Sequence, residues 1–584
     1  MKQWKRYKSY ILPYKSAFIL GPLMMVTEVL GEILLPKFMS MIINHGVAQK
    51  DGGYILKMGF VMAITSFLMA AGGILGAYFA AKASISFTSD LRRDLFARVQ
   101  QFSFKNIDTF STGSLVTRLT NDIQQVQNLI MMGLRMMLRA PGMFLGALVM
   151  AFWMNAELAA VILVVIPLLT AAIVWILRTA YPRFTAMQKA LDTLNSGIQE
   201  VLTNVRVVKS FVREDYEEKR FADTNRELKE AGLRALKIVI ATMPVMMFAM
   251  NVTTLAVVWF GGNLIIGGRM AVGDLTAFTT YIVQILMSLM MLSMVFLQSS
   301  RAMASIRRID EVLDEPIDLR DENASQKDRK VEKGRVEFKD VSFSYREGGE
   351  PVLSHISLTA EPGETIGILG ATGSGKTSLV QLIPRLYDAT SGTVKVGGQD
   401  VRRYYLAALR DAVGIVLQKN LLFSGTIRDN LRWGDPNADD ETLWAACRAA
   451  CADEFLERMP DGLDTDMGQG GVNVSGGQKQ RLCIARTLLK HPKVLIFDDS
   501  TSAVDTATEG KIRHALAALT DVTKLIIAQR ITSVMDADMI VILDDGKVHA
   551  VGTHKELLAN DTIYQEIYAS QMKGDDADGK GIQR

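Results

Sequence analysis

A glycine-rich segment that ends in lysine and threonine carries the clearest chemical signal in the sequence. It follows the apolar run 365–369, which predicts a buried strand, and it has the spacing GxxxxGK[ST]. Glycine lets backbone N–H groups curl around phosphate oxygens, and a helix beginning after the segment points the positive end of its dipole at the anion. We expect the phosphates of a nucleotide to lie against Gly370, Ala371, Thr372, Gly373, Ser374, Gly375, Lys376, Thr377 and Ser378.

A magnesium ion is expected beside this segment. In the same motif Lys376 reaches the β- and γ-phosphates and Thr377 ligates Mg²⁺. A second apolar run, 494–497, predicts a neighbouring strand that ends in Asp498. A carboxylate at the C-terminal end of such a strand lies where the water shell of Mg²⁺ needs one. These residues together predict an α/β nucleotide-binding domain.

Length and composition require more than this one domain. The 584 residues exceed the ~250–300 that a single core usually holds. With 49% apolar and 22% charged residues the chain is neither disordered nor fibrous, and a net charge of +3 gives no case for nucleic-acid binding. The three cysteines form no CxxC pattern, so we expect neither a disulfide framework nor a zinc site.

Six segments before residue 303 are long and apolar enough to cross a bilayer, which takes about 20 residues. They are 16–42, 55–82, 134–154, 156–177, 238–260 and 275–298. Lysine and arginine gather before the first segment and in the connections 83–133 and 178–237, so the N-terminus and both connections are expected in the cytoplasm. Apolar and charged residues recur at helical spacing in these connections, which predicts helices that extend several tens of Å beyond the membrane.

Two features of this region leave alternatives open. Residues 4–14 mix aromatic side chains with cations, which fits an interfacial helix on the inner leaflet or a solvated basic tail. Arg135 and Arg139 lie one helical turn apart in the third segment. They either line a polar cavity or extend to the cytoplasmic edge.

The pentapeptide Val474-Ser475-Gly476-Gly477-Gln478, between the two nucleotide motifs, makes a resemblance specific. Over essentially its whole length the chain resembles an ATP-binding-cassette (ABC) exporter half-transporter. The resemblance implies a multidomain fold, in which an α-helical polytopic bundle of six long transmembrane helices precedes an α/β P-loop ABC nucleotide-binding domain. We expect the membrane domain at 1–315, a linker at 316–334, the nucleotide-binding domain at 335–572 and a polar tail at 573–584.

The resemblance also implies roles for further residues. Tyr345 would stack on the adenine of ATP, and Gln418 would contact Mg²⁺ and face the membrane domain. The segment 502–505, which ends in Asp505, resembles the D-loop. In this family two cassettes dimerise head to tail, so the signature residues would serve an ATP bound mainly by the partner. Those residues are Ser475, Gly476, Gly477 and Gln478.

Two positions depart from the family pattern. Asp499 stands where the family usually has the glutamate that activates the attacking water, and Gln529 stands where it usually has histidine. Asp is one methylene shorter than Glu, which withdraws its carboxylate by about 1.5 Å. Gln cannot carry charge or transfer a proton. Because the signature is intact, this pattern implies a heterodimer with a partner that has Glu and His, as in heterodimeric bacterial multidrug exporters.

We therefore expect an ATPase-coupled subunit in the plasma membrane that exports apolar or amphipathic, drug-like compounds. Dense methionine in the spans suits adaptable apolar contacts, although packing or lipid contact explains most of these residues. Helices near 112–119 and 210–217 are expected to transmit closure of the cassettes. The alternatives are a lipid or peptide exporter and a nucleotide-gated regulatory protein that hydrolyses little ATP.

Overall fold

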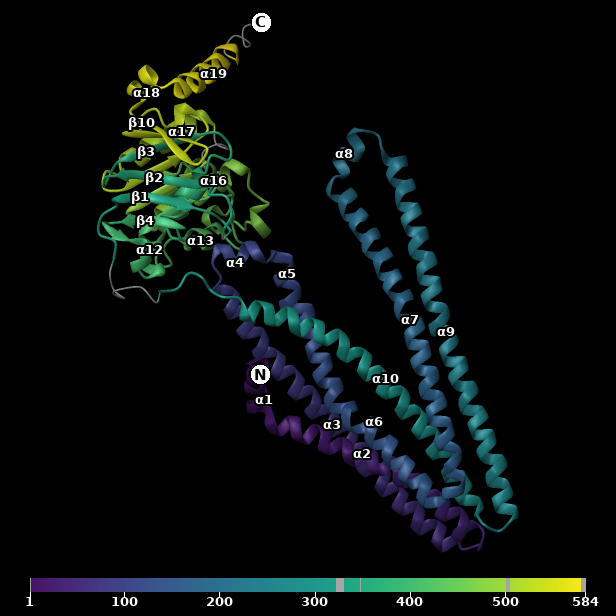
Figure 1. Ribbon diagram of the computed structural model, residues 1–584. Helices are drawn as coiled ribbons and strands as arrows, with labels where there is room; N and C mark the ends of the chain where they lie inside the picture. The colour runs from purple at the N-terminus through teal and green to yellow at the C-terminus, as the bar shows by residue number, and fades with distance from the viewer. Residues whose placement is uncertain (1, 322–329, 347, 500–504, 579–584) are drawn as a thin grey trace. The chain divides into compact units, whose positions relative to one another are not determined.

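The computed structural model describes residues 2–321, 330–346, 348–499 and 505–578 (Figure 1). Two compact units make up the chain. One unit contains residues 1–100 and 113–314, and the other contains residues 101–112 and 315–584. The first is helical and the second is an α/β domain, which confirms the fold class predicted from the sequence.

The first unit contains helices far longer than a bilayer requires. After α1 (Lys2–Ile11) come α2 (Lys15–Met41), α3 (Gly52–Gln100), α6 (Ile123–Met154), α7 (Ala156–Thr203), α9 (Glu214–Ile266) and α10 (Val272–Asp314). In the described part of the chain, six helical segments are long and apolar enough to cross a membrane. The 53 residues of α9 extend about 80 Å at 1.5 Å per residue, whereas the hydrocarbon core is about 30 Å thick. The predicted helical extensions are therefore present.

The long helices fall into two groups within this unit. Helices α2, α3, α6 and α10 pack together, and α7 packs along α9. Figure 1 shows α7 and α9 as an antiparallel pair joined through α8 (Val205–Ser210). Helix α8 ends where the predicted segment 210–217 begins, so the second expected connecting helix lies earlier in the sequence than predicted.

The N-terminal segment is a docked helix. The hydroxyl of Tyr7 donates to Asp310 of α10, and the hydroxyl of Tyr10 donates to Asp94 of α3, each at 3.0 Å. The structure thus contradicts the alternative of a solvated basic tail for this segment.

Arg139 lies in an ion triad between two membrane helices. Its guanidinium pairs with Glu28 at 3.2 Å and with Glu32 at 2.8 Å, both on α2. The three side chains are only 16–22% exposed. Arg139 therefore points at a neighbouring helix and does not extend to the helix end. The Nε atom of Arg135 is also buried.

The second unit contains two β-sheets. The smaller is antiparallel, with the order β2-β1-β4-β5, and the larger has the order β10-β9-β3-β8-β7-β6. In the larger sheet only β10 is antiparallel to its neighbour. The strands are β1 (Val336–Phe343), β2 (Leu353–Ala360), β3 (Thr365–Gly370), β4 (Ser391–Val396), β5 (Gln399–Asp400), β6 (Val413–Val416), β7 (Val494–Asp498), β8 (Thr523–Ile527), β9 (Met539–Asp544) and β10 (Lys547–Gly552).

Helices cover both sheets and define separate apolar cores. The cassette helices are α11 (Lys376–Gln381), α12 (Leu406–Ala412), α13 (Ile427–Leu431), α14 (Asp440–Ala449), α15 (Asp453–Leu456), α16 (Gly476–Leu488), α17 (Thr506–Ala517), α18 (His554–Asn560) and α19 (Thr562–Asp578). Helix α11 contributes Leu379 and Val380 to one core, and α16 contributes Leu482 and Ile484 to another. Helix α19 continues through 573–578, the first half of the expected polar tail.

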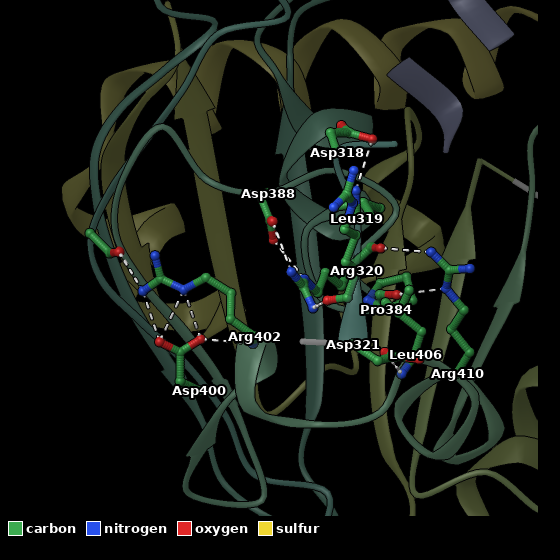
Figure 2. A network of polar contacts seen from close by, with 12 residues as sticks. Asp318, Leu319, Arg320, Asp321, Pro384, Asp388, Asp400, Arg402, Leu406 and Arg410 are labelled. Atoms are coloured by element: carbon green, nitrogen blue, oxygen red, sulfur yellow. Dashed lines mark hydrogen bonds and ion pairs between the residues drawn. The ribbon is translucent and has the colours of Figure 1, made fainter. Parts of the chain in front are cut away.

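The segment after the membrane helices lies on the cassette. The carboxylate of Asp321 accepts a hydrogen bond at 2.9 Å from the backbone N–H of Leu406, at the start of α12 (Figure 2). Nearby, Arg385 is 3% exposed and donates to Asp388 at 2.8 Å. The described first part of the expected linker is therefore bound to the nucleotide-binding domain.

Candidate nucleotide site

The glycine-rich segment forms the turn between β3 and α11, as predicted. Gly370, Gly373 and Gly375 have φ values of 154°, 88° and 92°, a region that residues with a Cβ rarely adopt. A Cβ at Gly370 would lie 2.2 Å from the carbonyl oxygen of Leu543. The ammonium of Lys376 donates to the carbonyl oxygens of Gly370 and Ala371, at 2.8 and 2.7 Å. Lys376 therefore lies against its own loop, where it is partly desolvated.

Two of the three residues expected at magnesium, Thr377 and Asp498, are in contact. The Thr377 hydroxyl donates to a carboxylate oxygen of Asp498 at 2.9 Å. Asp498 ends β7 and is 2% exposed. Burial raises the pKa of Asp498, against the hydrogen bond from Thr377 and the charge of Lys376, which lower it. A hydroxyl and a carboxylate oxygen at one point are hard ligands of the kind Mg²⁺ prefers, so these residues fit that ion.

Asp499 and Gln529 are also brought together, from the ends of two neighbouring strands. The Gln529 amide nitrogen donates to an Asp499 carboxylate oxygen at 2.6 Å. Burial raises the pKa of Asp499, and hydrogen bonds from Gln529 and Gln418 and the charge of Lys376 oppose the rise. Gln418 follows β6, so three adjacent strands deliver these three side chains to one edge of the sheet.

Asp499 has a left-handed backbone conformation. Its φ of 49° is uncommon for a residue with a Cβ, and its backbone N–H donates to the Ile527 carbonyl at 3.1 Å. Hydrogen bonds therefore anchor Asp499 through both its backbone N–H and its carboxylate. Such anchoring fixes the reach of a side chain that is already short.

Tyr345, the residue expected at the adenine, lies beside α11. Its hydroxyl is 2.8 Å from the hydroxyl of Ser378, and its ring is 40% exposed. The ring of Tyr387 packs edge-on against it, with centroids 5.3 Å apart. The exposed ring leaves an aromatic surface on which a base can stack.

Tyr387 joins this aromatic cluster to the first cytoplasmic connection. Its hydroxyl donates to Asp108 of α4 (Phe104–Thr109) at 2.7 Å, and its ring lies 6.0 Å from that of Phe104. Residues 101–112 belong to the cassette unit. The helix that contacts Tyr387 is thus α4, which was not predicted, whereas the short helix predicted near 112–119 is present as α5 (Thr112–Thr117).

The signature residues lie apart from the phosphate loop. Ser475 caps α16: its hydroxyl accepts from Gln478 N–H at 3.3 Å, and the Gln478 side chain accepts from Ser475 N–H at 2.9 Å. Gly476 and Gly477 form the first turn of α16. Among the described residues, no hydrogen bond joins this turn to the phosphate loop. An exposed helix start of this kind is suited to an anion from another molecule.

The predicted D-loop is only partly described. Residues 502–504 lie outside the described ranges, and Asp505 caps α17 by accepting from Thr508 N–H at 2.9 Å.

The sequence prediction also missed three polar contacts. They involve Glu28 and Glu32 with Arg139 in the membrane, Tyr387 with Asp108 of α4, and Gln571 of α19 with Gln529 and Ile531. A pair of glutamates four residues apart inside an apolar span was a signal that could have identified the first.

Comparisons with known proteins agree with this arrangement. Residues 18–289 match the family described as the ABC transporter transmembrane region, and residues 353–502 match the family described as ABC transporter. The chain is 42% identical over 564 residues to the uncharacterized ABC transporter ATP-binding protein YfiB of Bacillus subtilis, covering 97% of this chain and 98% of that one. The uncharacterized ABC transporter ATP-binding protein YknU of the same organism is 33% identical over 576 residues, and 98% of each chain is covered.

A solved structure supports the same family. The structure of a bacterial Atm1-family ABC exporter with ATP bound has a TM-score of 0.75 and 26% identity, covering 97% of this chain and 98% of that one. The chain therefore belongs to the ABC transporters, as an exporter half-transporter whose membrane domain is fused to its ATP-binding domain.

Proposed function

We propose that this ABC exporter subunit is the degenerate-site half of a heterodimer. Its own phosphate loop would bind ATP and turn it over slowly, while its signature residues would complete a competent site on the partner. The observation that carries this proposal is the pair formed by Asp499 and Gln529, bonded at 2.6 Å beside the phosphate loop. Both residues that would act on the attacking water are substituted, and they contact one another.

Asp499 has too short a side chain for its position, and Gln529 lacks a positive charge. Burial raises the pKa of Asp499, so its carboxylate is not an unusually weak base. A general base has to approach within about 2.6–3.2 Å of its proton or act through one water, and the aspartate is one methylene short. Gln529 engages the same carboxylate and, as a neutral amide, supplies no positive charge to the transition state. A homodimer would contain two such sites.

The groups that bind the nucleotide remain in place. Lys376 would exchange its two loop carbonyls for the β- and γ-phosphates. Thr377 and Asp498, with Gln418, would hold Mg²⁺, which neutralises phosphate charge when bound. Tyr345 would stack on adenine, and Asp505 belongs to the D-loop facing the other cassette. Tight binding with slow turnover follows from this combination.

The cargo that we propose is apolar or amphipathic. Met137, Met247 and Met287 are 71%, 61% and 49% exposed in the single chain. Flexible thioethers form adaptable apolar contacts, which suits compounds of varied shape. The intramembrane triad of Arg139 with two glutamates is a specific polar feature, and it favours a lipid or peptide as the alternative cargo. A nucleotide-gated regulator is the alternative if hydrolysis proves negligible even with a partner.

Photolabelling tests the degenerate site directly. The complex with a partner carrying Glu and His is trapped during turnover with 8-azido-ATP, and the labelled subunits are separated by tag. The azido group lies at the base, so each subunit reports the site where its own aromatic residue holds adenine. On this chain, a label carried in the γ-phosphate should persist, because the ATP stays intact. On the partner, only a label carried in the α-phosphate should remain, because hydrolysis removes the γ-phosphate.

A variant and a homodimer provide the controls. Lys376→Ala should remove label from this chain only. Equal loss of the γ-label on both subunits, or robust ATPase by a verified homodimer, would contradict the proposed division of roles.

A further inference from the structure

The last described helix of the cassette contacts residues 529–531, here called the switch segment, through one side chain. Gln571 of α19 accepts a hydrogen bond from the backbone N–H of Ile531 and donates one to the carbonyl of Gln529, both at 2.8 Å. A carboxamide presents an acceptor and donors on one group, as a backbone peptide does. Gln571 therefore pairs with the switch segment as a neighbouring strand would.

The contact falls where the sheet stops holding this segment. Pairing of β8 with β3 and β7 ends at Ile527, and Ala528 donates weakly to Ile368 at 3.3 Å. Gln529 comes directly afterwards, and Ile531 is the first residue of the short 3₁₀ helix Ile531–Ser533. The backbone groups that Gln571 binds thus lie beyond the last rung of the ladder.

Helix α19 is firmly seated at its beginning. Tyr564 is fully buried and packs in one core with Ala528 and Ile531. Its hydroxyl lies 2.6 Å from the His554 ring nitrogen. Gln571 is seven residues further on, which is two turns along the same face of the helix. The helix can therefore fix the amide of Gln571 relative to the sheet.

We propose that Gln571 is a positioning residue for Gln529, through which helix α19 sets how firmly this chain's own phosphate loop retains Mg-ATP. The chain of contacts runs from Gln571 to the Gln529 backbone and from the Gln529 side chain to Asp499. This inference rests on the proposed function, in which Gln529 and Asp499 lie beside the nucleotide bound to the phosphate loop. Gln571 itself touches no nucleotide; it acts through the residue that it holds.

The test measures the release of a nucleotide that cannot be hydrolysed. The full-length complex is placed in nanodiscs, and the partner's phosphate-loop lysine is replaced by alanine so that only this chain's loop binds tightly. Release of fluorescent Mg-AMPPNP is followed after a chase with unlabelled ATP. Gln571→Met, which removes both bonds and keeps the length, should speed release about tenfold, as expected for the loss of two neutral hydrogen bonds.

Matched variants separate positioning from general loosening. Gln565→Met is the control, because Gln565 lies on the same helix and donates to the Leu558 carbonyl at 2.9 Å, away from the switch. It should release nucleotide at the wild-type rate. Gln571→Glu keeps the acceptor for Ile531 and loses the donor, so its release should be faster than that of wild type.

A double-mutant cycle decides the proposal. In a Gln529→Ala background, Gln571→Met should add almost nothing, because the side chain that Gln571 positions is gone. Wild-type release by Gln571→Met, or an undiminished effect in the Gln529→Ala background, would overturn the inference. Because AMPPNP is not hydrolysed, the result is independent of whether this site proves degenerate in the photolabelling experiment.

Discussion

Replacing Ser475 with aspartate should damage the heterodimer far more than replacing Asp499 with alanine. Ser475 caps α16 by accepting from Gln478 N–H at 3.3 Å. Aspartate caps helices about as well as serine, and its charge suits a helix N-terminus. Helix α16 should therefore remain formed in Ser475→Asp, and the new feature is a carboxylate where the proposed function places the γ-phosphate bound by the partner.

The expected losses of ATPase rate in Ser475→Asp and Asp499→Ala differ by orders of magnitude. Loss of one preorganised donor aimed at transition-state charge costs ~2.7–4 kcal/mol, or roughly 100- to 1,000-fold in rate. A like charge about 4 Å away adds ~4 kcal/mol at an effective dielectric constant of 20. Asp499→Ala changes a site that already turns over slowly, so we expect a loss below about tenfold, or ~1.4 kcal/mol. Its effect should be seen mainly in nucleotide occlusion.

The assay is the ATPase rate of the complex with its partner, at matched expression and assembly. Ser475→Thr is the control, because threonine keeps both the hydroxyl and the cap, and it should retain most of the activity. Gly477→Asp should be at least as damaging as Ser475→Asp. If Asp499→Ala proved as crippling as either substitution, the assignment of the signature to the partner's competent site would be wrong.

Three further outcomes are expected. In a verified homodimer, Asp499→Glu or Gln529→His alone should restore little ATPase, and only the double variant should raise it clearly; full rescue by one substitution would contradict the two-residue argument. Arg139→Met should lower the thermal midpoint and the folded yield in detergent, because removing one partner of a buried ion pair costs ~3–5 kcal/mol. Adding Glu28→Gln and Glu32→Gln to this variant should restore stability. Tyr387→Phe loses a hydrogen bond to the Asp108 carboxylate worth ~1.5–3 kcal/mol; ATPase should respond less to membrane reconstitution while the affinity for Mg-ATP stays unchanged, and a loss of affinity instead would place Tyr387 in nucleotide binding.

The parts of the fold that local pattern governs were predictable. Apolar runs of the length of a bilayer became six membrane helices, and the apolar runs before Gly370 and Asp498 became adjacent buried strands. Parallel strands place their C-terminal ends at one edge of a sheet, so the approach of Asp499 to Gln529 also follows from strand order. These features depend on periodicity and strand ends, which the sequence contains directly.

Contacts between distant segments were not predictable in the same way. Tyr387 and Asp108 are 279 residues apart, and neither lies in a recognisable motif. Helix α4 was not predictable because 104–109 is short and polar, and its start is set by a capping box between Ser103 and Asn106. Residues 4–14 fit two environments, because aromatic and cationic residues suit lipid headgroups and acidic helices equally, and their acidic partners lie on α3 and α10.

Under the proposed function, the two substitutions at the nucleotide site slow hydrolysis, and the groups that would bind the phosphates and Mg²⁺ remain in place. Lys376, Thr377 and Asp498 retain their contacts, so ATP can still draw two cassettes together. Under the proposed function, Asp499 and Gln529 are poorly suited to activate the water that ends the bound state, and they contact each other. Gln571 holds the backbone of that pair from a helix that no nucleotide touches. In the proposed heterodimer, a subunit built this way would prolong the ATP-bound state of its own site, and the partner's site would then set the rate at which the exporter resets.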